Sequence, residues 1–189
     1  MGRAFARVMF SEAAKRYQER YGSRASYERV ERQGSPGDTF GPMEREFIEQ
    51  RDSFYMATVT ADAWPYVQHR GGPKGFLRVL DDRTVAFADF AGNAQFVSTG
   101  NLETNDRVAL FLMDYPNQAR LKVVGHARVV ESDAELDAKV AVPGYAAKVQ
   151  RVIVVEVVAF DWNCSQHITL RWTEEEVRAL MGETTGVAR

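Results

Sequence analysis

The first forty-two residues differ in pattern from the rest of the chain. Residues 11–33 are charged and helix-prone, and Ser11 is the expected N-cap of this stretch. The segment 34–42 (GSPGDTFGP) is dense in Gly, Pro and Asp, which is typical of a linker. We therefore interpret residues 1–42 as a helical arm and linker that packs on the main body or on a partner subunit.

From residue 54 onward, segments rich in β-branched and aromatic residues alternate with short polar turns. Strands are predicted over residues 54–60, 64–70, 75–80, 84–90, 107–114, 120–130 and 151–162. Helices are predicted over 43–51, near 95–101, after a capping box of Ser132 and Glu135, and after a capping box of Thr173 and Glu176. Short turns indicate an antiparallel sheet, and so few helices favour a closed or partly closed barrel over a doubly wound parallel sheet. The sequence thus predicts a mainly β, barrel-type domain with flanking helices over residues 43–189.

The strand at 151–162 is nearly continuous in Val, Ile and Phe. Such a run is typical of a strand that is buried on both faces. We expect the barrel interior to cover one face and a second subunit to cover the other, so the strand favours a homodimer.

Composition narrows the classes of function. The 189 residues include 24 Lys and Arg against 26 Asp and Glu, a net charge of −2 that argues against a nucleic-acid partner. No run of eighteen apolar residues is present, so we expect neither a membrane span nor a membrane partner. With no apolar leader and with Cys164 as the single cysteine, the sequence favours a cytoplasmic protein.

The common catalytic motifs of hydrolases, nucleotide-binding proteins and zinc peptidases do not occur in the sequence. His69, His126 and His167 are far apart and have no carboxylate at ligand spacing, so no metal site is expected. Cys164 is interpreted as a small, partly buried residue rather than a nucleophile. No catalytic residue is assigned.

Three polar segments, each next to a predicted strand, are the candidates for a functional site. Residues 68–78 (QHRGGPKGFLR) combine glycines that permit close backbone approach with three basic side chains suited to a phosphate. Residues 89–101 (DFAGNAQFVSTGN) open a helix with amides and hydroxyls, as anion sites do. Residues 161–171 (DWNCSQHITLR) offer an indole, an amide and a guanidinium, which suit a flat heterocycle. A solvated hairpin, a self-capped helix and a structured turn are the respective alternatives.

In this order, the three segments resemble the pyridoxamine 5′-phosphate oxidase-like family of FMN-binding split barrels. The resemblance covers about residues 47–172 and is strongest over 53–114. The segment DWNCSQHITLR is similar to the closing segment of the family, in which a Trp and, some ten residues later, an Arg reach the flavin. The resemblance implies an antiparallel six-stranded split β-barrel and an obligate homodimer with two FMN molecules at the subunit interface.

The resemblance also implies contacts for individual residues. Arg78 stands where relatives carry a Lys, on a strand that would run past the isoalloxazine edge, and Asp89 would lie near the ribityl chain. Arg120 stands where relatives place a Gln, while Trp162 and Arg171 would come from the other subunit. The implied FMN contacts are Arg70, Lys74, Gly75, Phe76, Leu77, Arg78, Asp89, Asn93, Gln95, Ser98, Thr99, Arg120, Trp162, Gln166, His167 and Arg171.

The sequence departs from the family pattern at the phosphate. Family members that oxidise vitamin B6 carry an Arg-Lys pair where this chain has residues 97–98 (Val-Ser), and no Lys or Arg lies between Asp89 and Asp106. The phosphate would then need a cation from elsewhere, with Arg70 and Lys74 as the candidates. Its neutral donors would be Asn93, Gln95, Ser98 and Thr99.

A second departure concerns the substrate. His167 and Thr169 stand where those oxidases use an Arg and a His to hold pyridoxal phosphate. Because loss of the Arg removes a bidentate phosphate clamp, we expect a small-molecule substrate other than vitamin B6 phosphate.

Three functions stay open at this stage. The leading one is an FMN-dependent oxidoreductase, since the cofactor carries the redox chemistry and no conventional catalytic set is required. The second is a non-catalytic, flavin-binding or stress-related module. The third is a split barrel that uses F420 or haem, which the lack of a basic cluster for a polyglutamate tail and of an evident haem-ligating His disfavours.

Overall fold

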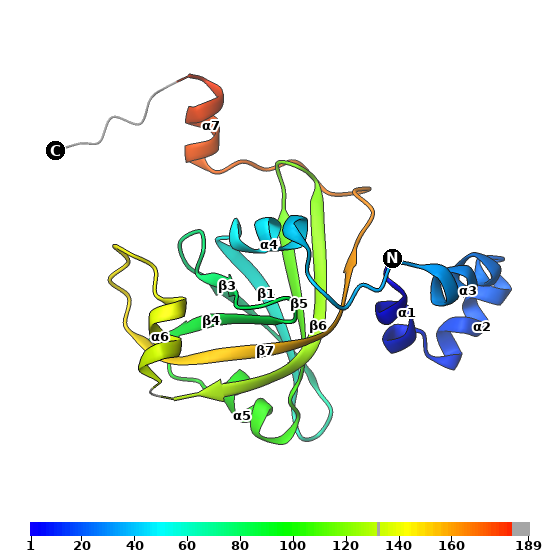
Figure 1. Cartoon of the computed structure of the whole chain (residues 1–189), viewed down its shortest axis with the longest axis horizontal. Helices are drawn as coiled ribbons and strands as arrows, with labels where there is room; N and C mark the ends of the chain where they lie inside the picture. The colour runs from blue at the N-terminus through cyan, green and yellow to red at the C-terminus, as the bar shows by residue number, and fades with distance from the viewer. Residues whose placement is uncertain (132, 183–189) are drawn as a thin grey trace.

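The computed structural model describes residues 1–131 and 133–182 (Figure 1). Its seven strands form one antiparallel sheet in the order β2-β1-β5-β6-β7-β4-β3. The strands are β1 (Ser53–Val59), β2 (Pro65–Gly71), β3 (Leu77–Val79), β4 (Thr84–Phe90), β5 (Arg107–Asp114), β6 (Ala119–Val130) and β7 (Val149–Trp162). The helices are α1 (Arg3–Met9), α2 (Glu12–Arg20), α3 (Arg24–Gln33), α4 (Pro42–Glu49), α5 (Val97–Thr104), α6 (Ala134–Val140) and α7 (Glu174–Leu180).

The predicted antiparallel, mainly β architecture is confirmed, and its seven strands correspond to the seven predicted segments, one more than the six that the family resemblance implied. The short edge strand β3 pairs only with Val85–Phe87 of β4. The two end strands of the sheet, β2 and β3, do not pair with each other, so the curled sheet is open along one seam. This seam leaves the last residues of β4 facing β2 without an intervening strand.

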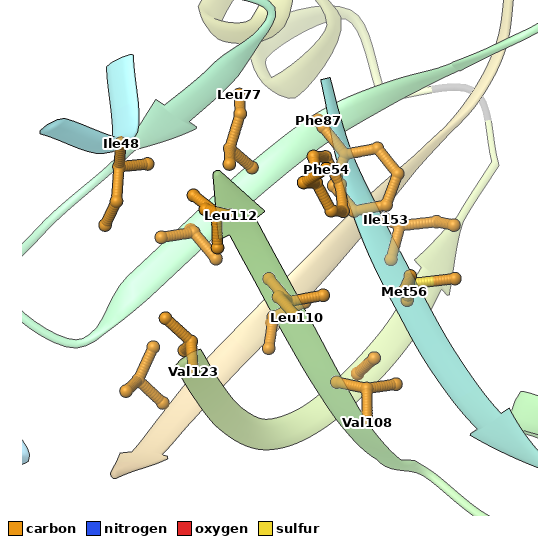
Figure 2. Packing of buried hydrophobic residues seen from close by; sticks show 14 of the residues in the cluster. Ile48, Phe54, Met56, Leu77, Phe87, Val108, Leu110, Leu112, Val123 and Ile153 are labelled. Carbon is orange, nitrogen blue, oxygen red and sulfur yellow. The ribbon is translucent and has the colours of Figure 1, made fainter. Parts of the chain in front are cut away.

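The hydrophobic core lies inside the curl of the sheet (Figure 2). Alternate residues of β1 and β5 point inward, which is the period-2 pattern that the sequence shows. Phe54 packs edge-on against Phe87 at a centroid distance of 5.0 Å, which links β1 to β4 across the interior. Ile48 of α4 is also buried in this cluster, so α4 closes one end of the barrel.

Helices of the same chain cover the two ends of the outer face of β7, while Glu156 and Val158 between them are exposed. Val152 and Val154 are buried together with Val140 of α6. Further along the strand, Ala159 is buried with Phe5 of α1. The expected burial of both faces is confirmed at the two ends of the strand, where the chain itself covers the outer face, and not at Glu156 and Val158.

The region that we interpret as a helical arm contains three helices rather than one continuous stretch. A turn at residues 21–23 separates α2 from α3, and α1 precedes the predicted region. Ser11 caps α2 by accepting a hydrogen bond from the Ala14 amide at 3.2 Å. Helix α1 is docked on the barrel, whereas α2 and α3 contain no buried residue and lie beside it away from the sheet (Figure 1).

The two predicted capping boxes have different outcomes. Thr173 and Glu176 cap α7 as expected. Ser132 lies outside the described residues, and α6 is capped by Asp133, whose side chain accepts from the Leu136 amide at 2.9 Å. In the described part of the chain, every helix is too short or too polar to cross a membrane.

Candidate functional site

A small cavity of about 60 Å³ lies at the open seam of the barrel, and we call it the seam cavity. One wall comes from β2, with Gln68 and Arg70, and the opposite wall comes from the end of β4, with Asp89. The loop that follows β4 and the first turn of α5 close it. The lining residues are Tyr66, Gln68, Arg70, Asp89, Phe90, Gly92, Asn93, Ala94, Gln95, Phe96, Val97, Ser98, Thr99 and Gln150.

Charged groups bridge the seam. Arg70 of β2 forms an ion pair with Asp89 of β4, and both side chains are only 11–12% exposed. A second guanidinium approaches the same carboxylate, with Arg151 Nε 3.4 Å from Asp89 Oδ2. Within the described residues, the buried Nε atoms of Arg70 and Arg151 have no hydrogen-bond partner. Two guanidinium groups therefore meet one carboxylate at the seam, where Arg70 lines the cavity and Arg151 lies behind its lining residues.

The first turn of α5 faces this charged group. Phe96, the N-cap residue, has a left-handed backbone (φ 52°) and supplies no side-chain cap, so the first amides of the helix are not satisfied by it. Two hydrogen bonds anchor the helix to the sheet: Ser98 Oγ to Gln68 Oε1 at 2.8 Å and Asn101 Nδ2 to Thr58 Oγ1 at 2.8 Å. Donors of the helix start are thus held rigidly beside the two arginines, an arrangement that suits an anion.

A larger cleft of about 640 Å³ lies between α4, the β1 and β5 ends and the segment that follows β7; we call it the α4 cleft. Its walls carry the aromatic side chains Phe47, Phe54, Tyr55, Phe111, Tyr115, Trp162 and Trp172, and charged side chains line it as well. Lys74 and Arg171, both expected flavin contacts, are among these charged residues, and the Arg171 guanidinium lies 4.9 Å from the Tyr115 ring centroid. The cleft can therefore take a flat aromatic group.

Contacts with α4 hold the Trp162 side chain in place at the wall of this cleft. Its indole N–H donates to Glu44 Oε1 at 2.8 Å, and its ring packs edge-on against Phe47 at a centroid distance of 4.7 Å. The second carboxylate oxygen of Glu44 accepts from the Gly41 amide at 3.0 Å. The indole N–H is therefore committed to α4, and the ring face alone is available to a ligand.

The profile of the pyridoxamine 5′-phosphate oxidase family matches residues 41–161, well over half of the chain. The chain belongs to this family. The resemblance drawn from the three polar segments is thereby confirmed, and the arm formed by residues 1–40 lies outside the family match.

Solved structures agree with the family fold. HupZ from Group A Streptococcus is 18% identical with a TM-score of 0.54, covering 70% of this chain and 100% of that chain. A Lactobacillus delbrueckii protein provisionally assigned as pyridoxamine 5′-phosphate oxidase is 20% identical with a TM-score of 0.51, covering 66% and 94%. An FMN-binding protein from Syntrophomonas wolfei is 13% identical with a TM-score of 0.51, covering 64% and 83%. At such identities the likeness establishes the fold alone. Among curated proteins, none matches this sequence.

The expected flavin contacts fall into two groups within one chain. The seam cavity brings together Arg70, Asp89, Asn93, Gln95, Ser98 and Thr99. The α4 cleft brings together Lys74, Trp162 and Arg171. The two sites share no lining residue. Of the two cations predicted for the phosphate, Arg70 is therefore at the seam cavity and Lys74 is not.

The remaining predicted contacts line neither site. Phe76 and Leu77 are core residues that are at most 1% exposed, so the expected flavin contact cannot involve their side chains. Gly75 has a φ of +84°, and the Arg78 guanidinium lies against it. The burial pattern of β3 turns its alternate residues into the core and explains why a strand expected to run past the flavin offers mainly backbone.

Three other predicted contacts are absent from the linings of both sites. Arg120 is on β6 opposite Met113, and its buried Nε has no hydrogen-bond partner within the described residues. Gln166 and His167 are exposed in the turn after β7, with His167 in a left-handed conformation (φ 65°). Nothing within this single chain brings these side chains to the seam cavity or the α4 cleft.

Sequence reasoning gave Arg151 no role at the seam, and it included Gln68 in a candidate segment without naming it as a contact. Arg151 opens the apolar strand β7 and is the direct register partner of Asp89. No local motif marks it, because its place beside Asp89 depends on the pairing of β4 with β7, strands that are some sixty residues apart in the chain. Only the strand register could have revealed it.

Proposed function

We propose that this protein is an FMN-binding flavoprotein and an oxidoreductase that acts on a small molecule other than vitamin B6 phosphate. The main support for this proposal is the seam cavity, where the side chain of Arg70 is only 12% exposed and its buried Nε has no hydrogen-bond partner within the described residues. A buried guanidinium with unused donors, next to uncapped amides of α5, suits a phosphate group. Membership of the family and the FMN-binding Syntrophomonas relative support the choice of FMN.

The residues present fit the phosphate of FMN better than its ring at the seam. A cavity of about 60 Å³ is of the size of a small anion and is too small for a whole flavin. Arg70, the Thr99 hydroxyl and the first amides of α5 would hold the phosphate, whereas the Ser98 hydroxyl already donates to Gln68. The ring would need a larger aromatic surface of the kind found in the α4 cleft.

We also propose that FMN binds between two copies of the chain. The seam cavity and the α4 cleft share no lining residue, and the family pattern assigns Trp162 and Arg171 to the other subunit. In such a homodimer, one copy would hold the phosphate and its partner would cover the ring. The bound flavin supplies the redox chemistry, while the chain binds it, orients it and excludes water from it.

A titration followed by quenching of flavin fluorescence tests the proposal. We expect saturable binding of FMN. Arg70→Ala should weaken FMN by about 1.5–3 kcal/mol, the range for a hydrogen bond to a charged group, and leave riboflavin affinity unchanged. Lys74→Ala is the matched control, because Lys74 lines the α4 cleft, and it should leave the ratio of FMN to riboflavin affinity unchanged.

Wild-type protein that binds neither FMN nor riboflavin would contradict the proposed function. Parallel titrations with F420 and with haem identify the cofactor in that case. Oxidation of NAD(P)H with a dye acceptor by the FMN-loaded protein then separates an oxidoreductase from a binding module: binding without turnover of any donor supports the module.

A further inference from the structure

We propose that Arg151 is the second cation of the flavin phosphate site and that Arg70, Asp89 and Arg151 together set the preference for FMN over riboflavin. The inference deepens the proposed function and rests on it. It supplies the positive charge that the loop between Asp89 and Asp106 lacks. The charge comes from β7, the strand next to β4 in the sheet.

The strand register puts Arg151 in place. Arg151 and Asp89 are directly opposite each other in the antiparallel pair of β4 and β7, so their side chains leave the sheet on the same face. The Arg151 side chain is only 10% exposed. Arg70 reaches the same carboxylate from the far side of the seam. Asp89 is thus a positioning residue that holds two guanidinium groups close to one point.

Contacts with the cavity wall fix the Arg151 guanidinium. It lies 4.8 Å from the ring centroid of Phe96, and its Nη2 donates to Gln150 Oε1 at 3.1 Å. Phe96, Gln150 and Asp89 all line the seam cavity. The guanidinium therefore packs directly behind three lining residues of the cavity, and its buried Nε, although 3.4 Å from Asp89 Oδ2, makes no hydrogen bond within the described residues.

The net positive charge of the Arg70–Asp89–Arg151 cluster favours binding of an anion. Asp89 neutralises one of the two guanidinium groups, and the cluster of three keeps a net charge of +1 in a site that is about nine-tenths buried. An uncompensated buried charge lowers the stability of the fold. A bound phosphate group would compensate the charge and accept hydrogen bonds from the donors that have no partner. If the role of Arg151 were only to neutralise Asp89, Arg70 would already suffice.

The test compares Arg151→Gln with Arg128→Gln, which removes the same charge from an exposed position on β6. We expect Arg151→Gln to weaken FMN about ten- to hundredfold, as for the loss of a hydrogen bond to a charged group, with riboflavin affinity unchanged. Arg128→Gln should change neither affinity. Arg151→Lys keeps the charge but loses the planar fork, and its FMN affinity should fall between those of the wild type and Arg151→Gln.

A measurement without flavin supplements the titration. Inorganic phosphate should raise the midpoint of thermal unfolding of the wild type and of Arg128→Gln but not of Arg151→Gln. Equal losses of FMN and riboflavin affinity, equal effects of the two Gln variants, or an unchanged phosphate effect in Arg151→Gln would overturn the inference. If Arg151→Gln does not fold, Arg151→Lys decides: FMN affinity equal to that of the wild type overturns it. Equal affinity of the wild type for FMN and riboflavin would also overturn the inference about Arg151, but not the proposal that the protein binds a flavin. A wild type that binds neither compound would overturn the proposed function itself.

Discussion

Gly125 shows how one residue sets the shape of the sheet. It lies at a register shift between β6 and β7, and a Cβ atom there would stand 2.2 Å from the carbonyl oxygen of Glu156. Because backbone must move to relieve that contact, Gly125→Ala should destabilise the fold by about 1–3 kcal/mol or more. Gly100→Ala, in α5 with open space around it, should be neutral or stabilising by roughly 0.5–1 kcal/mol. Urea unfolding of both variants checks the difference; equal stabilities would mean that the sheet adapts freely at Gly125.

Trp162 gives a second prediction at this scale. Trp162→Phe removes the N–H that donates to the buried carboxylate of Glu44, so the free energy of unfolding should fall by about 1–3 kcal/mol. Glu44→Gln keeps an acceptor for the indole and should cost less. Unfolding and FMN affinity are measured on the same samples. Full stability with weakened FMN affinity would show that the indole serves the ligand rather than the attachment of α4.

The limits of sequence reasoning at residue scale are clear at the seam. Arg70 and Asp89 could be predicted because they lie in polar segments with a recognisable ligand chemistry. Arg151 could not, because it lies near the start of an apolar strand and acquires its neighbour only through the register with β4. Phe76 and Leu77 can contact a ligand only through their backbone, because the family pattern locates a strand but does not say which side chains turn into the core.

At the scale of elements, α1 is the part of the arm that the barrel depends on. Phe5 is 5% exposed, packs with Val124 and Ala159, and carries the Lys122 ammonium 4.5 Å from its ring centroid. Phe5→Ala should therefore lower the free energy of unfolding by about 3 kcal/mol. Tyr17→Ala on α2, where the side chain is 61% exposed, should stay within about 0.5 kcal/mol of the wild type. Similar values for both would mean that α1 is not an integral part of the fold.

All seven strands could be predicted because period-2 alternation and turn residues are local signals. What covers a strand is not a local property. The apolar run of β7 indicates two buried faces in the same way whether α1 and α6 or a second subunit covers the outer one. Helix α1 was missed because its seven residues carry Arg3 and Arg7 and no acidic first turn, so its start has no strong N-terminal signal.

At the scale of the whole molecule, a further apolar surface stays open. A groove of about 760 Å³ lies between the arm and the outer face of β1, β2, β5 and β6; we call it the arm groove. Val67 is 60% exposed there and Tyr55 42%. Tyr55 and Phe111 line both the arm groove and the α4 cleft, so the apolar surface runs from one into the other. This continuity makes the outer face of the sheet the expected place for a second copy.

The last prediction joins assembly to cofactor binding. If two copies meet on this face and FMN binds between them, light scattering should give about twice the chain mass of 21.3 kDa. Val67→Asp places a charge in the centre of an interface that, for an obligate dimer, buries about 2,000 Å² or more. It should yield monomers and weaken FMN binding, although Val67 lines neither the seam cavity nor the α4 cleft. Tyr21→Asp, at a 74% exposed position on the arm, should leave both properties unchanged. A monomeric wild type with full FMN affinity would contradict the shared site and require each chain to complete it alone.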